Sequence, residues 1–236
     1  MTRLFDDKVP GRVILEGVGG SISHGLNNEN SDVDTVGVYI APIQDVMGME
    51  GISAVKNSVV TTSPDATFHE VGKFCNLAIK GNPSILEQLW IDHYYRHLTG
   101  AMLIARRKKF LGSLKIRSAY LGYAHQQVER IGRHPKNSET EDKVKKLAKH
   151  AIRLTIQGRE LLETGDLPLN LSDRKEEILC QADFSVSNWF KFHEFMEKQM
   201  NKLETQKASI PEHPDMEYIN GTLIQIRKFE LQVEEK

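Results

Sequence analysis

Gly-Gly-Ser-Ile-Ser-His-Gly at residues 19–25 is followed shortly by Ser-Asp-Val-Asp at residues 31–34. Ahead of the glycines, Val-Ile-Leu at residues 13–15 predicts a short buried strand, and the glycine-serine turn would then open a helix. Free backbone N–H groups at the start of such a helix can hold phosphate. Val-Gly-Val-Tyr-Ile at residues 36–40 predicts the next strand. This order predicts that a phosphate-binding turn and two aspartates meet at one cleft.

The two aspartates are predicted metal ligands. Residues two apart on a strand point the same way, so Asp32 and Asp34 would project from one face. Two nearby carboxylates repel each other unless a cation neutralises them. Carboxylate oxygens suit Mg²⁺, and one or two such ions could bind here. Each motif alone also has an ordinary interpretation, because glycine-serine runs form tight turns and Ser or Asp residues begin turns and cap helices.

Composition limits the class of protein. A chain of 236 residues suits one large domain or two smaller ones, and its formal net charge of −1 lacks the global basic character of a nonspecific nucleic-acid binder. No run approaches the roughly 18 apolar residues of a membrane-spanning helix, and the polar, acidic start does not resemble a secretory signal. Cys75 and Cys180 form no Cys-x-x-Cys pair, so both thiols are expected to be reduced. We therefore expect a cytoplasmic protein without membrane association.

The first half of the chain mixes short strand-like runs with helical segments, whereas the second half has helical periodicity. This predicts an α/β (α+β) core with a small mixed sheet at residues 1–104 and a mainly α-helical domain at residues 105–236, packed against the cleft of the core. The predicted elements include a strand at 59–62, helical structure at 68–90 interrupted at 81–83, a helix at 139–163 stopped by Gly165, and a last helix at 216–233.

The helix predicted at 139–163 carries a charged stripe beside its apolar one. Lys146, His150, Arg153 and Gln157 follow one another at helical spacing. Helices ordinarily carry charge opposite their apolar side, so a solvated surface is one interpretation. Contact with a triphosphate is the other.

A third carboxylate would be needed near the acceptor, where it can position or deprotonate the attacking hydroxyl. Asp-Ala-Thr-Phe-His-Glu at residues 65–70 offers Asp65 at a strand start and Glu70 at a helix entrance. We choose Asp65, because a strand-borne aspartate can face the first pair across the sheet. A cap or turn role for Asp65 stays open.

The chain resembles the DNA polymerase β-like nucleotidyltransferase superfamily in Gly20-Ser21, Gly25, Asp32-x-Asp34 and a later aspartate. Further segments resemble predicted nucleotidyltransferases of bacteria and phages that are associated with RNA repair. These segments are Lys73-Phe74, Gly81-Asn82-Pro83 with Glu87-Gln88-Leu89-Trp90, His150-x-x-Arg153 and Pro211-Glu212-His213-Pro214-Asp215. Nearly the whole chain is covered by the resemblance.

This resemblance implies a nucleotidyltransferase core and assigns the site. Asp32, Asp34 and Asp65 would be the catalytic carboxylates and ligands of Mg²⁺, or of Mn²⁺ in its place. The nucleotide would be held by Gly20, Ser21, Gly25, Ser31, Lys146, His150 and Arg153. Many relatives have a basic residue soon after the glycine-serine pair, whereas this chain has Ile22 and Ser23, with His24 as the nearby cation candidate.

The expected reaction moves a nucleoside monophosphate from an NTP, such as ATP, to an acceptor hydroxyl and releases pyrophosphate. An RNA end is the first choice of acceptor, and a small molecule or a protein is the alternative. A noncatalytic nucleotide-binding module is a further alternative, motivated by the altered residues after Ser21. The sequence leaves the base preference and the oligomeric state open.

Overall fold

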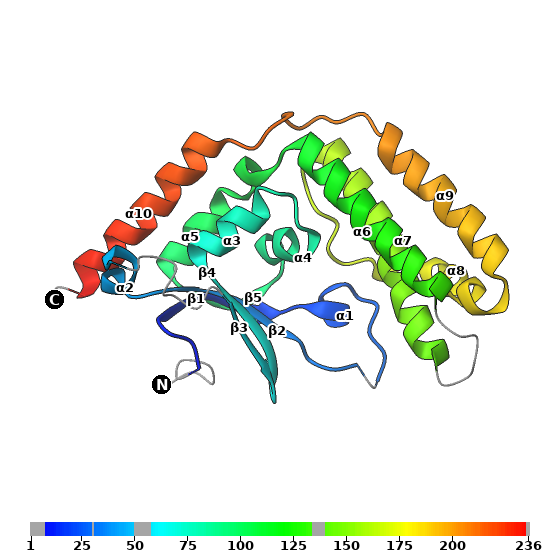
Figure 1. The fold of residues 1–236 in the computed structure, drawn as a ribbon, viewed down its shortest axis with the longest axis horizontal. Coiled ribbons are helices and arrows are strands. Elements are labelled where there is room, and N and C mark those ends of the chain that lie inside the picture. Colours follow the sequence, from blue (N-terminus) through cyan, green and yellow to red (C-terminus); the bar gives the residue numbers. More distant parts are fainter. Residues whose placement is uncertain (1–7, 30, 50–57, 134–139, 235–236) are drawn as a thin grey trace. The chain divides into compact units, whose positions relative to one another are not determined.

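The structure is a computed structural model that describes residues 8–29, 31–49, 58–133 and 140–234 (Figure 1). Its described residues form two compact units. The first unit comprises the described parts of 1–79, 84–110 and 214–236, and the second comprises those of 80–83 and 111–213. The sequence predicted one domain boundary after residue 104. In the structure, residues 105–110 and the last helix belong to the first unit.

A five-stranded mixed sheet forms the centre of the first unit. The strands are β1 (Arg12–Val18), β2 (Thr35–Ile40), β3 (Ser58–Thr62), β4 (Asp65–Glu70) and β5 (His93–Arg96), in the order β3-β4-β2-β1-β5. β2 and β4 run parallel, whereas the other neighbours are antiparallel. The small mixed sheet predicted from the sequence is confirmed.

Helices α3 and α5 lie beside this sheet (Figure 1). The first unit holds α1 (Gly20–Ser23), α2 (Ile43–Met47), α3 (Val71–Ala78), η2 (Glu87–Leu89), α5 (Leu98–Ala105), η3 (Arg107–Phe110) and α10 (Met216–Glu234), and α4 (Pro83–Leu86) begins at the boundary between the units. Val13, Tyr39 and Phe68 pack in one buried cluster.

The helical prediction was wrong for residues 68–70, which belong to β4. Ala66, Phe68 and Glu70 are buried, while the residues between them are half-buried. This alternation is the period of a strand with one covered face. The helix begins only at Val71, where the Glu70 side chain accepts a hydrogen bond from the Gly72 N–H and caps it.

The described part of the second unit is helical, as predicted for the C-terminal half. It contains α6 (Ser113–Arg133), α7 (Glu141–Thr164), η5 (Ser172–Arg174), α8 (Lys175–Ser187) and α9 (Trp189–Thr205). Buried Leu147, Leu154 and Leu161 repeat at seven-residue spacing on α7. Gly165 ends this helix at a φ of 71°, and its N–H donates to the Leu161 carbonyl, so the predicted stop is confirmed.

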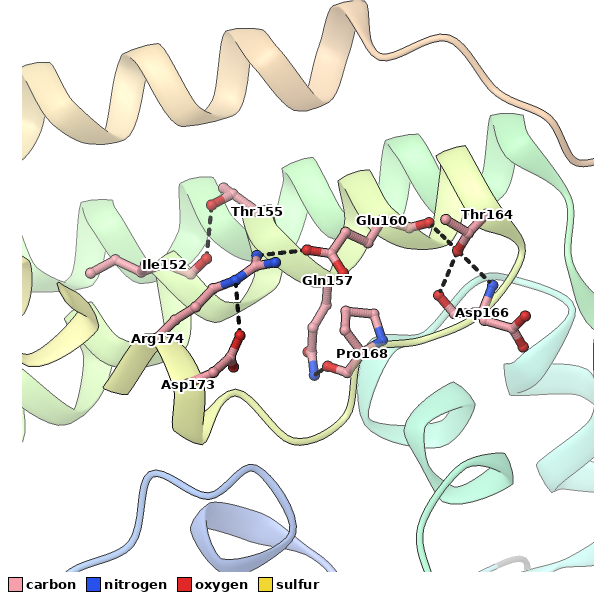
Figure 2. A network of polar contacts seen from close by, with 9 residues as sticks. All are labelled: Ile152, Thr155, Gln157, Glu160, Thr164, Asp166, Pro168, Asp173 and Arg174. Carbon is pink, nitrogen blue, oxygen red and sulfur yellow. Dashed lines mark hydrogen bonds and ion pairs between the residues drawn. The ribbon is translucent and has the colours of Figure 1, made fainter. Parts of the chain in front are cut away.

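Polar contacts fasten the segment after α7 to that helix (Figure 2). Gln157 Nε2 donates to the Pro168 carbonyl at 3.1 Å, and the Arg174 guanidinium pairs with Glu160 at 2.6 Å. The Thr164 hydroxyl accepts from the Asp166 N–H at 3.1 Å. Within the described residues, no helix has the length and apolar character needed to span a membrane.

Candidate active site

The glycine turn and the aspartate segment are direct neighbours. Because β1 and β2 pair antiparallel with Val18 opposite Thr35, the end of one strand meets the start of the other. The Gly19 N–H donates to the Asp34 carbonyl at 2.8 Å, which fastens the two segments together. The structure therefore brings Gly20 and Asp34 to one place.

Gly20 lies directly against the Asp34 carboxylate. Its φ is +64°, and a Cβ added at this position would lie 1.9 Å from Asp34 Oδ2. No side chain fits there without displacing the carboxylate, and the backbone conformation itself favours glycine. Sequence and structure thus agree that the turn holds a glycine next to an aspartate.

The rest of the turn is compact. α1 is a single turn of helix, and after it the Gly25 N–H donates to the Ile22 carbonyl and the Leu26 N–H to the Ser21 carbonyl, both at 3.0 Å. Ser21 is half-buried. Ser31 lies before the aspartates, where its hydroxyl accepts from the Asn28 N–H at 2.9 Å and so closes the connecting loop.

Asp32 and Asp34 precede β2, which begins at Thr35. Asp32 is exposed and Asp34 is half-buried. A regular strand therefore does not set the relative direction of the two side chains, and the carboxylate that the structure ties to the turn is that of Asp34.

Asp65 and Asp34 occupy equivalent positions at the starts of two adjacent parallel strands, Asp65 as the first residue of β4 and Asp34 immediately before β2. Ala66 pairs with Thr35, and each aspartate lies one residue before its member of this pair. Asp65 is exposed, and by alternation it shares the side of β4 on which Thr67 and His69 lie. The carboxylate predicted for the acceptor side thus lies at the same end of the sheet as Asp34.

Glu70, the alternative third carboxylate, is engaged elsewhere. It is fully buried on the opposite side of β4, and its Oε1 pairs with Arg227 Nη2 of α10 at 2.5 Å. The same carboxylate, together with burial, raises the pKa of Tyr39 to about 12; burial is the larger cause. Its contacts are those of a cap and an ion pair.

The donor set near the turn fits Mg²⁺ in its chemistry. Among the residues that the structure describes, no three His, Cys, Asp or Glu side chains converge as a ready metal-binding group. Mg²⁺ ordinarily keeps several waters and binds through one or two carboxylates together with substrate phosphates. Asp34 offers such oxygens beside the glycine turn, and the exposed Asp32 lies two residues before it in the chain.

His24 is not an exposed cation at the turn. It is buried, and its Nε2 lies 3.4 Å from Glu87 Oε2, which is also buried, on η2. The pair joins the end of the glycine turn to the segment that precedes β5. In the sequence, Glu87 is visible only as part of the Glu87-Gln88-Leu89-Trp90 motif, and the signal for its buried role is an acidic residue that directly follows the apolar pair Ile85-Leu86.

The charged stripe predicted for residues 139–163 lies on α7 in the second unit. Lys146 is exposed, His150 is half-buried, and Arg153 is buried, with its Nη1 donating to Gln157 Oε1 at 3.0 Å. Their contact with a triphosphate stays a prediction.

The family model described as "RlaP: RNA repair pathway DNA polymerase beta family" matches residues 4–225. The chain therefore belongs to this family. Membership identifies a polymerase β-like family of an RNA repair pathway and supports a transferase, as the sequence motifs predicted. A comparison with curated proteins gave no match.

Proposed function

We propose that this member of the RlaP family transfers a nucleoside monophosphate from an NTP to a hydroxyl at an RNA end and releases pyrophosphate. The acceptor oxygen attacks the α-phosphorus, the bond between that phosphorus and the bridging oxygen to the β-phosphate breaks, and the proton of the hydroxyl passes to Asp65.

The contact between Gly20 and Asp34 carries this proposal. A phosphate-binding turn alone is common, and so is an aspartate before a strand. Here a Cβ at Gly20 would collide with Asp34 Oδ2, so phosphate donors and a carboxylate share one small region. Phosphoryl transfer needs such a combination, because the phosphates must be held while their charge is offset.

The residues of the candidate site have distinct proposed roles. Ser21 and the backbone N–H groups of the turn bind and orient the leaving phosphates. Asp32 and Asp34 would hold Mg²⁺, or Mn²⁺ in its place, and the bound ion would offset negative charge on the phosphates. Asp65 positions the acceptor hydroxyl. Lys146, His150 and Arg153 are proposed to add positive charge for the triphosphate.

RNA is favoured over a small-molecule or protein acceptor because the family is described by its RNA repair pathway. A noncatalytic nucleotide-binding module is the second candidate function. The buried His24, which leaves the turn without the basic residue of many relatives, is the observation that favours it.

Variants of the turn and the aspartates test the proposal. With NTP labelled at the α-phosphate, Mg²⁺ and RNA carrying a free 3′ hydroxyl, Asp34→Asn and Gly20→Ala are each expected to lower transfer at least 100-fold, on the order of the loss when one charge-stabilising group is removed. Gly20→Ala should lose activity because the added methyl group displaces the Asp34 carboxylate.

Asp45→Asn is the matched control, because Asp45 is an exposed carboxylate on α2. It should transfer label at the wild-type rate. Wild-type transfer by Asp34→Asn would overturn the proposal. Tight NTP binding without label transfer to any RNA, small molecule or protein would favour the binding module.

A further inference from the structure

Three polar side chains meet at the β3–β4 edge of the sheet. Ser58 Oγ lies 2.7 Å from His69 Nδ1, and Lys73 Nζ donates to the same Ser58 oxygen at 2.7 Å. The Ser58 hydroxyl oxygen thus contacts both the Lys73 ammonium and the His69 imidazole. The three residues come from β3, β4 and α3, so the fold and not a local turn assembles them.

Positive charge in this cluster has no negative counterpart among the described residues. Lys73 donates to the Ser58 hydroxyl, and the Glu70 carboxylate at the start of the same helix pairs with Arg227. Burial, and then the Lys73 charge, lowers the pKa of His69 to about 4, so its imidazole is neutral at physiological pH. The half-buried Lys73 ammonium has three N–H donors, and one of them binds Ser58. The others suit the binding of an anion.

The cluster lies on the acceptor side of the candidate site. Asp65, Thr67 and His69 alternate along β4 and share one side of it. His69 lies four residue steps along the strand from Asp65, a distance of about 13 Å. The glycine turn instead follows β1, which lies two strands away from β4 in the sheet.

We propose that Ser58, His69 and Lys73 bind a backbone phosphate of the acceptor RNA strand, upstream of the hydroxyl that reacts. A stacked strand advances about 3.4 Å per nucleotide, so a strand ending at Asp65 would place a phosphate at the cluster about four nucleotides from its end. Lys73 supplies the positive charge that attracts the phosphate, and the Ser58 hydroxyl positions the Lys73 ammonium. The inference rests on the proposed function and deepens it by naming a strand as the acceptor.

Acceptor length provides the test. Lys73→Met should raise the KM for a ten-nucleotide RNA about tenfold, the loss expected for one charge-assisted contact. The KM for a dinucleotide acceptor and the KM for NTP should not change. Lys73→Arg should restore most of the loss, and Ser58→Ala, which keeps the charge, should show a smaller effect in the same direction.

Binding without turnover separates this inference from the proposed function. Fluorescence anisotropy with a ten-nucleotide RNA that ends in a 3′-deoxynucleotide, without NTP, should show about tenfold weaker binding to Lys73→Met. The slope of log affinity against log salt should fall by about 0.7 in magnitude. Lys80→Met, at an exposed lysine, is the control and should match the wild type.

Equal losses for dinucleotide and ten-nucleotide acceptors would overturn the inference. Unchanged RNA binding by Lys73→Met would overturn it too, as would a selective loss of binding to inorganic tripolyphosphate, because that result assigns the cluster to the NTP. Weakened RNA binding together with an absence of transfer by the wild type would instead overturn the proposed function and support the phosphate site.

Discussion

At the residue scale, the glycine turn depends on partners that lie on both sides of it. Asp34 lies against Gly20 at the start of the turn, and Glu87 lies against His24 at its end. The first contact involves a group proposed to act on substrate. The second is buried, so His24 and Glu87 influence the chemistry by holding the turn in place.

Removing one partner of the buried pair should loosen the turn. Glu87→Gln removes the carboxylate that lies against the buried His24 imidazole, and we expect the free energy of unfolding to fall by about 1–3 kcal/mol and the KM for NTP to rise. Urea denaturation and initial-rate kinetics measure the two effects.

Glu129→Gln is the control for this variant, because the Arg133–Glu129 pair is exposed and its loss should cost less than about 1 kcal/mol. The double variant His24→Gln, Glu87→Gln should recover part of the stability, since two neutral side chains can replace the pair. An unchanged KM for NTP in Glu87→Gln would contradict the positioning role.

At the scale of elements, the last helix belongs to the sheet unit. Arg227 of α10 pairs with the fully buried Glu70 of β4, and Glu230 of the same helix lies 3.2 Å from Arg12 Nε of β1. These two contacts attach α10 to two strands, β4 and β1, that lie on either side of β2 in the sheet.

Breaking the first of these pairs should release α10. Arg227→Met leaves a buried carboxylate uncompensated, and we expect a destabilisation of about 3–5 kcal/mol with faster hydrogen exchange of the α10 amides. Lys228→Met changes an exposed neighbour and should exchange like the wild type. Unaltered exchange in Arg227→Met would show that the pair does not hold the helix.

Much of the element pattern could be predicted from the sequence. The predicted helices at 139–163 and 216–233 correspond to α7 (Glu141–Thr164) and α10 (Met216–Glu234), because helical periodicity over many residues is a strong signal. The strand start at Asp65 and the helix entrance at Glu70, both predicted from residues 65–70, are confirmed by β4 and by the Glu70 cap of α3. The helical segment predicted from residue 68 began too early, because no breaking residue separates the strand from the helix.

The candidate site could likewise be predicted from the sequence only in part. The contiguous glycine turn and the aspartates that follow it are visible as motifs, and the structure brings Gly20 and Asp34 together. The partners of Glu70 and His24 are not visible, because they are set by tertiary packing; Glu70 and Arg227 are 157 residues apart. The predicted roles of Asp65 and Lys146 stay predictions.

At the scale of the whole molecule, two half-buried histidines couple stability to pH. Burial is the main cause that lowers the pKa of His69 and of His93 to about 4, with Lys73 and Arg96 adding to it. The unfolded chain protonates these groups near pH 6.5. Between about pH 6.5 and 4 the unfolded state therefore binds more protons, and stability falls as the pH is lowered.

Replacing both histidines should flatten this dependence. His69→Gln, His93→Gln should lose less free energy of unfolding between pH 7 and pH 4.5 than the wild type does, as measured by urea denaturation at several pH values. Carboxylates contribute equally to both proteins, so the difference reports the histidines. Identical pH profiles would contradict the assignment.

The net charge of −1 means that any RNA acceptor must be held by local positive charge and not by the molecule as a whole.

Nucleotide transfer by this chain is tested most directly by an experiment that follows the α- and γ-phosphates of the triphosphate separately. RNA with a free 3′ hydroxyl, and the same RNA ending in a 3′-deoxynucleotide, would be incubated with NTP labelled at the α- or the γ-phosphate. Nucleotide transfer should give α-label on the RNA that has the hydroxyl, γ-label in pyrophosphate, and no label on the deoxy-terminated RNA. Label from the γ-phosphate on RNA, or release of both labels without any acceptor, would contradict it.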